Sequence, residues 1–576
     1  MQNLKRIHLT FIFLFVAAIS VRGLGLTAQA PSIQARENPS ARAKDMCPVR
    51  STSMNAGDIA LARDEYDKAI DFYAAGMGLA GPEGARAHNA LIRALLAANR
   101  IDEAEANAKA WAATSPSDSW GRTSLGEVQL RKGEIRAALA TLQAALAGDS
   151  CNARTRADLA RLYELAGMFA AAKKMLDSAH ALDSVDDEIE WQWIFSEAPK
   201  AQIEELEKYL HRSASLLTGE RKNELVQRQK RLGLAFTDTC RMTTPIRSTT
   251  IPYYLVQNGP TARIFWSLQV TIDGKNLRLS EDSTISGILL KKSVAEETHL
   301  QPVADVEVDG IGSQAAVTAA VARAKSIRIG ALEFQNCDVQ VAKDDLKVYG
   351  ETAWEKVHDA YLERGSDGLI GPDAFRDFLL TLDKPGREFR LDPLPEPPGA
   401  AGDPAVRRLV TGVAPPAEPL HDRYIDPAMK DWTKGFRSGQ FVLFPLRLNE
   451  GPEGIYSFAT NSSLNSVSLE TAGQVVNVGR KGAELPSMSG HNGQFFKTSE
   501  VTLHFLGVKE LVDGMAAMDT TVWSHNHGVG LTGFLGAPML DQFALHLDYR
   551  DNLIRIDYDP KRIAHCPPNL KLPSCY

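Results

Sequence analysis

Residues 277–290 read LRLSEDSTISGILL, in which an acidic residue, hydroxyl residues and a glycine stand between two apolar runs. The alternation before Asp282 and the apolar run after Gly287 predict two strands joined by a turn that displays the Asp282 carboxylate. A second stretch, YSFATNSSLNSVS at 456–468, has the same order of strand, turn and strand, but Ala459 stands where the acid would be. The comparison of these two turns decides what the C-terminal half can do.

The segments around the two turns share an order of features. Each begins with strand-like runs, continues through a glycine-bearing turn and ends with an apolar-apolar-Gly turn before another apolar segment. The glycine-bearing turns are VDGIGS at 308–313 and MSGHNG at 488–493, and the final turns begin DGLIG at 367 and GFLG at 533. We therefore expect two copies of one β-rich module, lobe 1 at 250–391 and lobe 2 at 431–562. The Pro-, Gly- and Ala-rich residues 392–430 suit an extended linker between them.

This order resembles the retropepsin-like aspartic peptidases, including the bacterial aspartyl protease domains that are often joined to tetratricopeptide repeats. In that family each lobe offers an Asp-Thr/Ser-Gly turn, and two aspartates share one proton across the lobe interface. One carboxylate acts as a base on water, and the other polarises the scissile carbonyl. The resemblance makes Asp282 the catalytic aspartate of lobe 1 and Ser283 the hydroxyl that braces its turn. It also makes the turns with Gly310, Gly312, Gly490 and Gly493 hairpin flaps over a peptide groove.

Both turns depart from the family pattern. Thr284 stands where the family has glycine, and a β-branched residue there predicts that the turn is strained or changes shape. In lobe 2, Ala459 occupies the aspartate position, Thr460 keeps the bracing hydroxyl and Asn461 replaces the glycine. On this alignment no catalytic pair forms within one chain. Glu281 neighbours Asp282 but is expected to point the other way, because successive strand residues face opposite sides.

The N-terminal half repeats at a period of 34 residues. Leucine recurs at 91, 125 and 159, alanine at 104, 138 and 172, and Asn99, Gly133 and Gly167 keep the same step at a turn. The period predicts helix pairs at 50–83, 85–118, 119–152 and 153–186, followed by a helical cap to residue 236. The pattern resembles the tetratricopeptide repeat, which implies a concave surface for a peptide or protein partner. The expected fold is thus an all-α tetratricopeptide superhelix followed by two all-β, retropepsin-like (acid protease) lobes.

The first thirty residues have the pattern of an export signal. Lys5 and Arg6 precede an apolar run from Leu9 to Val21, and Ala28-Gln29-Ala30 is a small-x-small cleavage site. An uncleaved anchor is the alternative. We expect a signal at 1–30, a disordered stretch at 31–49 and a periplasmic or secreted protein without a membrane span after cleavage. The net charge of −7 and the lack of a basic stripe argue against a nucleic-acid partner.

Six cysteines in an exported chain permit disulfides without fixing the pairing. The nearest pair is Cys566 and Cys575 in the tail, residues 563–576, and the other four suit buried free thiols equally well or better. His525 and His527 would share a face on a strand, as metal ligands can, but no acid or cysteine close by completes a set. A polar surface loop is therefore expected there, and neither a metal nor a cofactor is predicted.

Two function classes follow from these patterns, and whether the chain is an enzyme stays open. In the first, the chain is an exported repeat protein whose aspartyl protease-like lobes have lost catalysis and bind peptides or proteins. In the second, it is an active aspartic endopeptidase that uses Asp282, through a homodimer of two lobe 1 copies or through an unrecognised second acid. Asp282 could also serve only to cap its own turn. A third interpretation gives the lobes a purely structural role and leaves binding to the repeats.

Overall fold

The computed structural model describes residues 47–50, 54–213, 217–235, 240–245, 248–257, 264–308, 317–343, 366–396, 409, 420–462, 464–485 and 493–558. Residues 39–576 form one compact unit. The expected signal at 1–30, Gly310, Gly312, Gly490, most of the linker and the tail with Cys566 and Cys575 lie outside the described residues. Within the described part, no helix is both long and apolar enough to cross a membrane.

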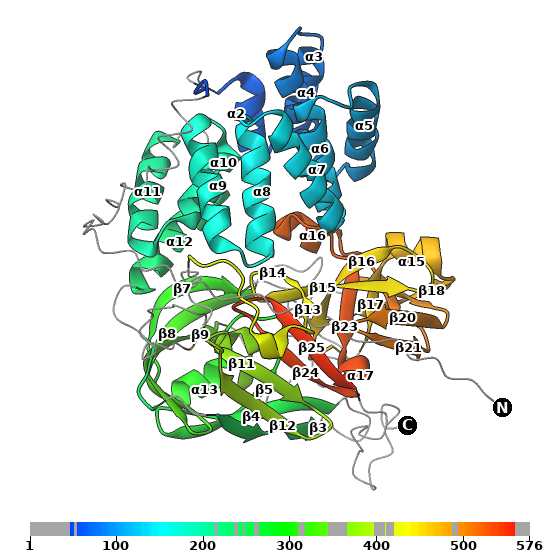
Figure 1. Ribbon diagram of the computed structural model, residues 1–576. Helices are drawn as coiled ribbons and strands as arrows, with labels where there is room; N and C mark the ends of the chain where they lie inside the picture. Colours follow the sequence, from blue (N-terminus) through cyan, green and yellow to red (C-terminus); the bar gives the residue numbers. More distant parts are fainter. Residues whose placement is uncertain are drawn as a thin grey trace, which may run out of the picture. The chain divides into compact units, whose positions relative to one another are not determined.

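The N-terminal half is helical, and Figure 1 shows its helices in blue to green. Four helix pairs come first, α2–α3, α4–α5, α6–α7 and α8–α9, and three further helices follow where the cap was expected. Their bounds are α2 Ala56–Ala62, α3 Tyr66–Gly76, α4 Pro82–Ala97, α5 Ile101–Thr114, α6 Ser119–Arg131, α7 Ile135–Gly148, α8 Ala153–Leu165, α9 Phe169–Leu182, α10 Asp187–Ser196, α11 Pro199–Arg212 and α12 Gly219–Ala235.

The repeated turn position has a clear backbone reason. Asn99, Gly133 and Gly167 directly follow the ends of α4, α6 and α8, and their φ angles are +58°, +80° and +74°. This left-handed conformation ends helices, and glycine and asparagine adopt it most readily. The repeated alanines are buried in the second helix of each pair, at 104, 138 and 172. The 34-residue period therefore encodes helix ends and close helix contacts.

The described residues of the C-terminal half form three sheets. The lobe 1 sheet has the order β1-β9-β6-β10-β5-β4-β8-β7, with β3 paired to β4. Its strands are β1 Arg241–Met242, β3 Tyr254–Gln257, β4 Ile264–Ile272, β5 Lys275–Glu281, β6 Ile288–Leu290, β7 Pro302–Val308, β8 Val317–Ile329, β9 Leu332–Ala342 and β10 Gly368–Ile370. The short helices α13 Lys292–Glu297 and η1 Pro372–Phe375 also belong to this part of the chain.

The lobe 2 sheet has the order β18-β19-β22-β17-β23-β16-β15-β20-β21, with β14 paired to β15. Its strands are β14 Phe436–Ser438, β15 Phe441–Leu448, β16 Glu453–Ala459, β17 Ser466–Ser468, β18 Val478–Leu485, β19 Gly493–Thr498, β20 Val501–Phe505, β21 Val508–Val512, β22 Ala516–Met518 and β23 Gly533–Gly536. Helices α15 Leu469–Val475, α16 Thr521–His527 and α17 Ala537–Leu540 lie between strands in the sequence.

The two lobes repeat one strand arrangement. Lobe 1 contains the run β6-β10-β5-β4, and lobe 2 contains β17-β23-β16-β15. In each run the strand that precedes the turn of interest pairs in parallel with the apolar-apolar-Gly strand, β5 with β10 and β16 with β23. The repeated order of features in the sequence thus corresponds to a repeated sheet topology.

A third, six-stranded sheet joins the two halves of the β region, in the order β13-β25-β24-β11-β12-β2. Its strands are β2 Thr249–Pro252, β11 Phe378–Asp383, β12 Glu388–Pro393, β13 Thr433–Lys434, β24 Phe543–Asp548 and β25 Leu553–Tyr558. Strand β11 pairs with β24 from Leu379↔Asp548 to Asp383↔Ala544. The last strands of lobe 1 and the last strands of lobe 2 are therefore neighbours in one continuous sheet. Regular structure lies at both ends of the expected linker: β12 ends inside it, and η2 Pro427–Met429 lies near its end.

Two disulfides correct the expectation of free thiols. Cys47 is bonded to Cys151, and Cys240 is bonded to Cys337. The spacing along the chain was misleading, because the fold brings together residues about a hundred positions apart. The first bond also places Cys47 inside the ordered structure, although 31–49 was expected to be disordered. The nearby Arg50 N–H donates to the Leu182 carbonyl at 2.9 Å.

Helices α6 to α8 pack on lobe 2 through a shared apolar cluster. Leu130, Leu159 and Leu162 from the helices belong to the same buried cluster as Phe441, Trp523 and Phe534 from lobe 2. The turn glycine Gly133 lies so close that an added Cβ would be 2.5 Å from the Gly530 carbonyl oxygen. The helical half and lobe 2 therefore share one buried apolar cluster, beside the separate clusters that each contains.

Candidate functional site

The turns at Asp282 and Ala459 occupy equivalent places in their lobes. In lobe 1, Glu281 at the end of β5 pairs with Ile370, and the next N–H, that of Asp282, donates to the Ile370 carbonyl at 2.9 Å. In lobe 2, Ala459 at the end of β16 pairs with Gly536. Asp282 is level with Gly371, the last residue of GLIG, just as Ala459 is level with the last residue of GFLG. The strand register thus sets Ala459 at the position equivalent to Asp282.

The glycine at the end of each apolar-apolar-Gly strand leaves room for the neighbouring turn. A Cβ at Gly371 would lie 2.3 Å from the Ile285 carbonyl oxygen, and one at Gly536 would lie 2.3 Å from the Leu464 carbonyl oxygen. A Cβ does not approach a non-bonded oxygen this closely, so any larger residue would displace the backbone of the turn. The two glycines therefore have the same structural role in both lobes.

The two turns interlock through their hydroxyl residues. The Ser283 N–H donates to Thr460 Oγ1 at 2.8 Å, and the Thr460 N–H donates to Ser283 Oγ at 3.1 Å. The Ser283 hydroxyl in turn donates to the Phe458 carbonyl at 2.8 Å. All three groups are buried, so each bond is shielded from water. The bracing roles inferred for Ser283 and Thr460 correspond to this reciprocal pair of hydrogen bonds.

The Asp282 carboxylate is 5% exposed, and hydrogen bonds from the protein reach both of its oxygens. Oδ1 accepts from the Thr284 N–H at 3.0 Å and from the Thr284 hydroxyl at 2.6 Å. Oδ2 accepts from Asn461 Nδ2, across the lobe interface, at 3.2 Å. Gln440 Nε2 donates to the Thr284 carbonyl at 3.0 Å and fixes the same turn from lobe 2. Thr284 and Asn461, which stand where the resemblance predicts glycine, therefore donate the hydrogen bonds that the Asp282 carboxylate accepts.

Of the two outcomes expected at Thr284, a strained backbone or a changed turn shape, the positive φ that would indicate strain is not found, and a changed shape stays a prediction. Among the described residues, those with positive φ include neither Thr284 nor Asn461. Their side chains thus reach Asp282 from a backbone conformation that any residue can adopt. The left-handed conformation nearest this turn belongs to Gly287, at φ +71°.

Glu281 does not complete a catalytic pair. Its carboxylate lies 3.6 Å from Lys384 Nζ, and Lys384 also donates to the Thr460 carbonyl at 3.1 Å. Both side chains are almost fully buried. Burial raises the pKa of Glu281, and the ammonium group of Lys384 opposes that rise. Glu281 and Lys384 thus form a buried ion pair, and Lys384 also hydrogen-bonds the backbone of the lobe 2 turn.

His525 and His527 lie on helix α16, so the expected surface loop is wrong. The His527 ring stacks on Trp523 at a centroid distance of 4.1 Å, and its Nδ1 lies 2.9 Å from Ser438 Oγ. Burial, with the charge of Arg161 as a second cause, lowers the pKa of His527 to about 4. Within the described residues, no group of three or more His, Cys, Asp or Glu side chains could hold a metal ion.

Three of the four glycines expected in flaps fall, along the sequence, in the connections of two antiparallel hairpins, and the fourth begins a strand. Gly310 and Gly312 lie between β7 and β8, and Gly490 lies between β18 and β19. These three residues are outside the described part of the chain, and Gly493 is the first residue of β19. The strands flanking both connections pair as hairpins, but the position of the tips over a groove stays a prediction.

Sequence reasoning missed two residues of the site, Gln440 and Lys384. Neither belongs to a motif, and Lys384 is separated by about a hundred positions from the turn of Glu281. The one local signal for Lys384 is that this charged residue directly follows the strand-like run FLLTLD.

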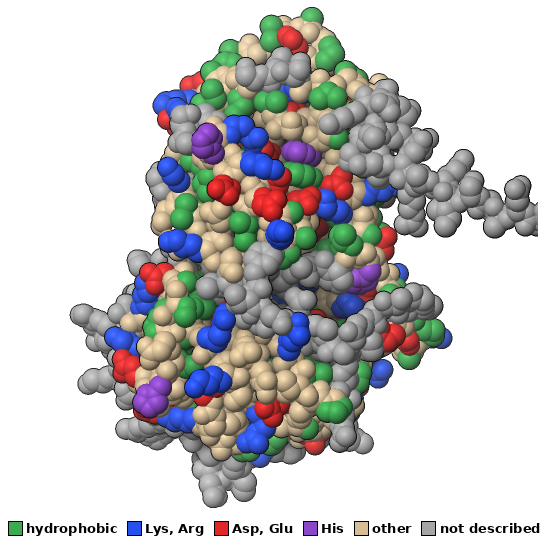
Figure 2. Space-filling model, turned by 90° about the vertical axis from the view of Figure 1, so that its left-hand side faces the viewer, with side chains coloured by type: hydrophobic (Ala, Val, Ile, Leu, Met, Phe, Trp, Pro, Cys, Tyr) green, Lys and Arg blue, Asp and Glu red, His purple; other side chains and the backbone are tan. Residues whose placement is uncertain are grey.

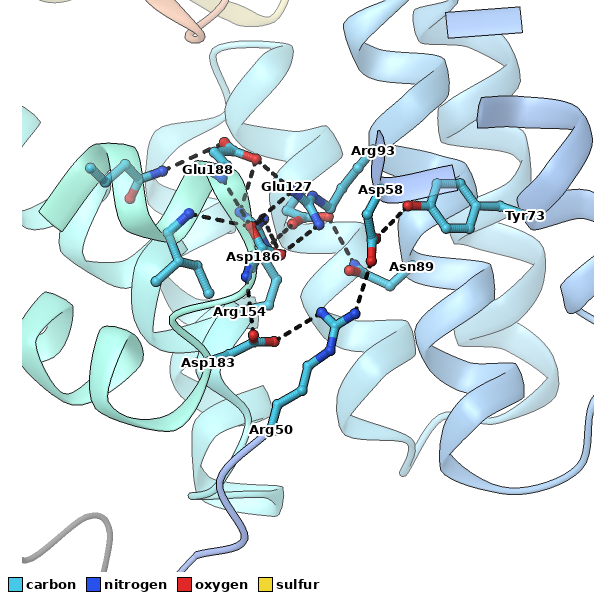
Figure 3. A network of polar contacts seen from close by, with 12 residues as sticks. Arg50, Asp58, Tyr73, Asn89, Arg93, Glu127, Arg154, Asp183, Asp186 and Glu188 are labelled. Carbon is cyan, nitrogen blue, oxygen red and sulfur yellow. Dashed lines mark hydrogen bonds and ion pairs between the residues drawn. The ribbon is translucent and has the colours of Figure 1, made fainter. Parts of the chain in front are cut away.

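A second polar site lies in the helical half, where charged side chains from several helices meet (Figure 3). Arg93 on α4 and Arg154 on α8 both contact Asp186 and Glu188 at the start of α10. Arg50 joins the first and last repeats, because it pairs with Asp58 and with Asp183. On the face shown in Figure 2, Lys and Arg side chains are scattered among Asp and Glu and form no basic stripe.

Comparison with known proteins places a family match in lobe 1. Residues 268–374, which include Asp282, Ser283 and Thr284, match the model of the aspartyl protease family. No curated protein shows significant similarity to the chain. The solved aspartic proteinase of Irpex lacteus shares 9% identity with a TM-score of 0.31, covering 57% of this chain and 100% of that one.

Two solved helical proteins are similar to other parts of the chain. A thermophilic TPR protein of Thermus thermophilus shares 20% identity with a TM-score of 0.23, covering 35% of this chain and 100% of that one. MamA shares 18% identity with a TM-score of 0.18, covering 28% of this chain and 99% of its own.

Proposed function

We propose that the chain is an exported repeat protein whose two retropepsin-like lobes bind an extended peptide without cleaving it. One observation carries the proposal: the Asp282 carboxylate is bonded by Thr284 and Asn461, and Ala459 stands where a second carboxylate would be. The helical half, on this proposal, holds a protein partner of its own.

Hydrolysis of a peptide by an aspartic peptidase needs a second carboxylate, which this pair of turns does not supply. Two carboxylates must share a proton, so that one activates water while the other donates to the scissile carbonyl. Asp282 is the single carboxylate that the two turns contribute, and its lone pairs accept the hydroxyl and amide donors beside it. Oδ1 accepts two hydrogen bonds and Oδ2 accepts one, so a water molecule would compete with the Thr284 hydroxyl and the Asn461 amide for Asp282.

Strand addition is the binding mode that the sheets support. Strand β7 ends the order of the lobe 1 sheet, and β18 ends the order of the lobe 2 sheet. A terminal strand offers backbone N–H and C=O groups to an extended peptide, and alternate side chains of that peptide then supply specificity. Both strands belong to the hairpins whose tips were expected to act as flaps.

Export is supported by the disulfides. Bonds between Cys47 and Cys151 and between Cys240 and Cys337 are typical of proteins that fold in oxidising compartments. They agree with the export signal read from residues 1–30, and a periplasmic or secreted location remains our proposal.

The alternative, an active peptidase, meets an obstacle within the chain. A homodimer that joined two copies of lobe 1 would have to separate Ser283 from Thr460 and would break their reciprocal hydrogen bonds. The separation would also expose the lobe 2 turn and the buried Glu281–Lys384 pair. Within the described residues no acid side chain is hydrogen-bonded to Asp282, which supports the proposal of binding over that of cleavage.

The test is a library of extended peptides, assayed in parallel for binding and for cleavage from about pH 3 to about pH 8. We expect wild type to retain a subset of peptides with no new termini detected by mass spectrometry, and Asp282→Asn to behave alike in cleavage. Cleavage by wild type that disappears in Asp282→Asn would establish the peptidase. A fragment that ends near residue 240 and retains all partner binding would instead favour a purely structural role for the lobes.

A further inference from the structure

The polar site of the helical half contains more carboxyl groups than its arginines can neutralise (Figure 3). Arg154 contacts Asp186 at 2.8 Å and Glu188 at 3.0 Å, and Arg93 contacts the same two acids at 3.0 and 2.8 Å. Asp186 and Glu188 are therefore each bonded by both guanidinium groups. These pairs hold the start of α10 against α4 and α8, and they leave little of either guanidinium group for other acids.

Glu127 on α6 and Asp158 on α8 are the acids that remain. Glu127 accepts a neutral hydrogen bond from Asn89 at 3.0 Å, and Arg154 Nε lies 3.9 Å from its other oxygen. Asp158 is 5% exposed, and its buried Oδ2 accepts no hydrogen bond from the described residues. An unsatisfied buried carboxylate oxygen costs free energy unless a proton or a bound cation compensates it.

A cavity opens beside this pair. Its volume is about 330 Å³, and Glu127 and Asp158 line it together with the aromatic side chains of Tyr66 and Trp191. Arg93, Arg131 and Arg161 also line it, so a cationic ligand would have to bind on the side where the two acids lie. One water molecule takes about 30 Å³ of liquid volume, so the cavity has room for a long side chain. Carboxyl groups beside aromatic rings suit a cationic group, since both attract positive charge.

We propose that Glu127 and Asp158 bind a positively charged amine or guanidinium group, the side chain of a lysine or arginine of the protein partner. The inference rests on the proposal that the helical half holds a partner, and it names the chemistry that this surface recognises. A guanidinium group can donate to two carboxyl groups at once, which an ammonium group does with less directional fit. No set of three metal-type ligands exists among the described residues, so a side-chain cation suits the pair better than a metal ion.

Without a ligand, a proton serves the same purpose. Burial raises the pKa of Glu127 and, more strongly, that of Asp158. Glu127 adds to the rise at Asp158, whereas a hydrogen bond with Asp158 opposes the rise at Glu127. Arg154 and Arg93 oppose the rise at Glu127, whereas Glu188 adds to it. Arg154 likewise lowers and Glu188 raises the pKa of Asp158. A bound cation would displace the proton, and the affinity for it should therefore increase with pH through the range in which the pair titrates.

The experiment uses the full chain and two small probes, Nα-acetyl-arginine amide and its neutral isostere Nα-acetyl-citrulline amide, titrated by ligand-observed NMR. We expect the arginine probe to bind and the citrulline probe to bind at least about tenfold more weakly, as loss of a charged hydrogen bond predicts. Asp158→Asn should weaken the arginine probe by about tenfold or more, and Glu127→Gln should do the same. The matched control is Asp102→Asn, an exposed acid on α5 outside the cavity.

Equal binding of the two probes, or an Asp158→Asn variant that is folded by circular dichroism and binds arginine as wild type does, would overturn the inference. So would affinity for the arginine probe that stays constant from about pH 4 to about pH 8. Binding of extended peptides by the lobes, measured in the same Asp158→Asn variant, separates the two proposals. If the variant still binds extended peptides but no longer binds the arginine probe, the result supports this cation site and leaves the proposal for the lobes unaffected.

Discussion

Ser283 and Thr460 lie in different lobes, and the backbone N–H of each donates to the hydroxyl oxygen of the other, at 2.8 and 3.1 Å. Asp282 contacts the same lobe 2 turn, because its Oδ2 accepts a hydrogen bond from Asn461 Nδ2 at 3.2 Å. The interlock thus joins the turn that holds Asp282 to the turn in which Ala459 occupies the equivalent position. On the function proposed above, this interlock supports peptide binding and not cleavage.

The interlock should contribute measurably to stability. Ser283→Ala removes the acceptor of the Thr460 N–H and the donor to the Phe458 carbonyl, and it leaves two buried groups without partners. We expect the free energy of unfolding in urea to fall by about 2–4 kcal/mol. Ser499→Ala, at an exposed serine of lobe 2, is the control and should change it by less than about 0.5 kcal/mol. Equal effects of the two substitutions would show that the interlock contributes nothing.

The paired glycines should be equally intolerant of a side chain. Gly371→Ala and Gly536→Ala each bring a Cβ to 2.3 Å from a turn carbonyl, and we expect each to lower the unfolding free energy by about 1–3 kcal/mol. Gly473→Ala on α15 is a matched control, because no atom lies within 4 Å of its added Cβ. That control should be neutral or stabilising by up to about 1 kcal/mol. A harmless Gly536→Ala would contradict the equivalence of the two lobes.

Protonation of His527 should destabilise the protein in acid. Burial and Arg161 lower the folded-state pKa to about 4, whereas the unfolded histidine titrates near its ordinary value. The unfolded chain therefore binds the extra proton first, and stability is lost as the pH falls from about 6.5 to about 4. The shift corresponds to about 3 kcal/mol at the acid end of that range.

His527→Phe tests this source of acid sensitivity. Phenylalanine keeps a ring against Trp523 but cannot titrate, so the slope of urea stability against pH in that range should become shallower. The comparison is between slopes, since loss of the contact with Ser438 shifts the whole curve. An unchanged slope would mean that other groups cause the acid sensitivity.

The lobe 1 disulfide should be a major stabilising element. Cys240 and Cys337 close a loop with a sequence separation of 97, for which chain entropy predicts about 3–5 kcal/mol. The double variant Cys240→Ala with Cys337→Ala should show this loss in urea unfolding. Peptide mapping without reductant should recover the Cys240–Cys337 and Cys47–Cys151 links, and it also tests the expected Cys566–Cys575 link. An unchanged urea midpoint after reduction of both described disulfides would refute the prediction.

Local patterns in the sequence predicted the parts of this fold that depend on local chemistry. Asn99, Gly133 and Gly167 indicated helix ends because the left-handed conformation restricts residue type. The GLIG and GFLG turns located the strands beside Asp282 and Ala459, because only glycine leaves room for the turn.

Contacts between distant segments could not be read in the same way. The hydrogen bond from Asn461 to Asp282 spans 179 positions, and the Glu281–Lys384 pair joins segments that share no motif. The expectation of strain at Thr284 failed because the family glycine was taken to mark a backbone requirement, whereas the threonine side chain here bonds the carboxylate. The short stretch WSHNHG has too little periodicity to indicate helix α16.

The measurement that tests the central claim most directly restores the family pattern and looks for chemistry. The variant combines Ala459→Asp, Thr284→Gly and Asn461→Gly, which supplies the second carboxylate and frees the oxygens of Asp282. Wild type and this variant, both checked for folding by circular dichroism, are incubated with the same peptide library from about pH 3 to about pH 8. We predict no cleavage by wild type and cleavage by the repaired variant that is lost when Asp282→Asn is added. Cleavage by wild type itself, abolished by Asp282→Asn, would contradict the account.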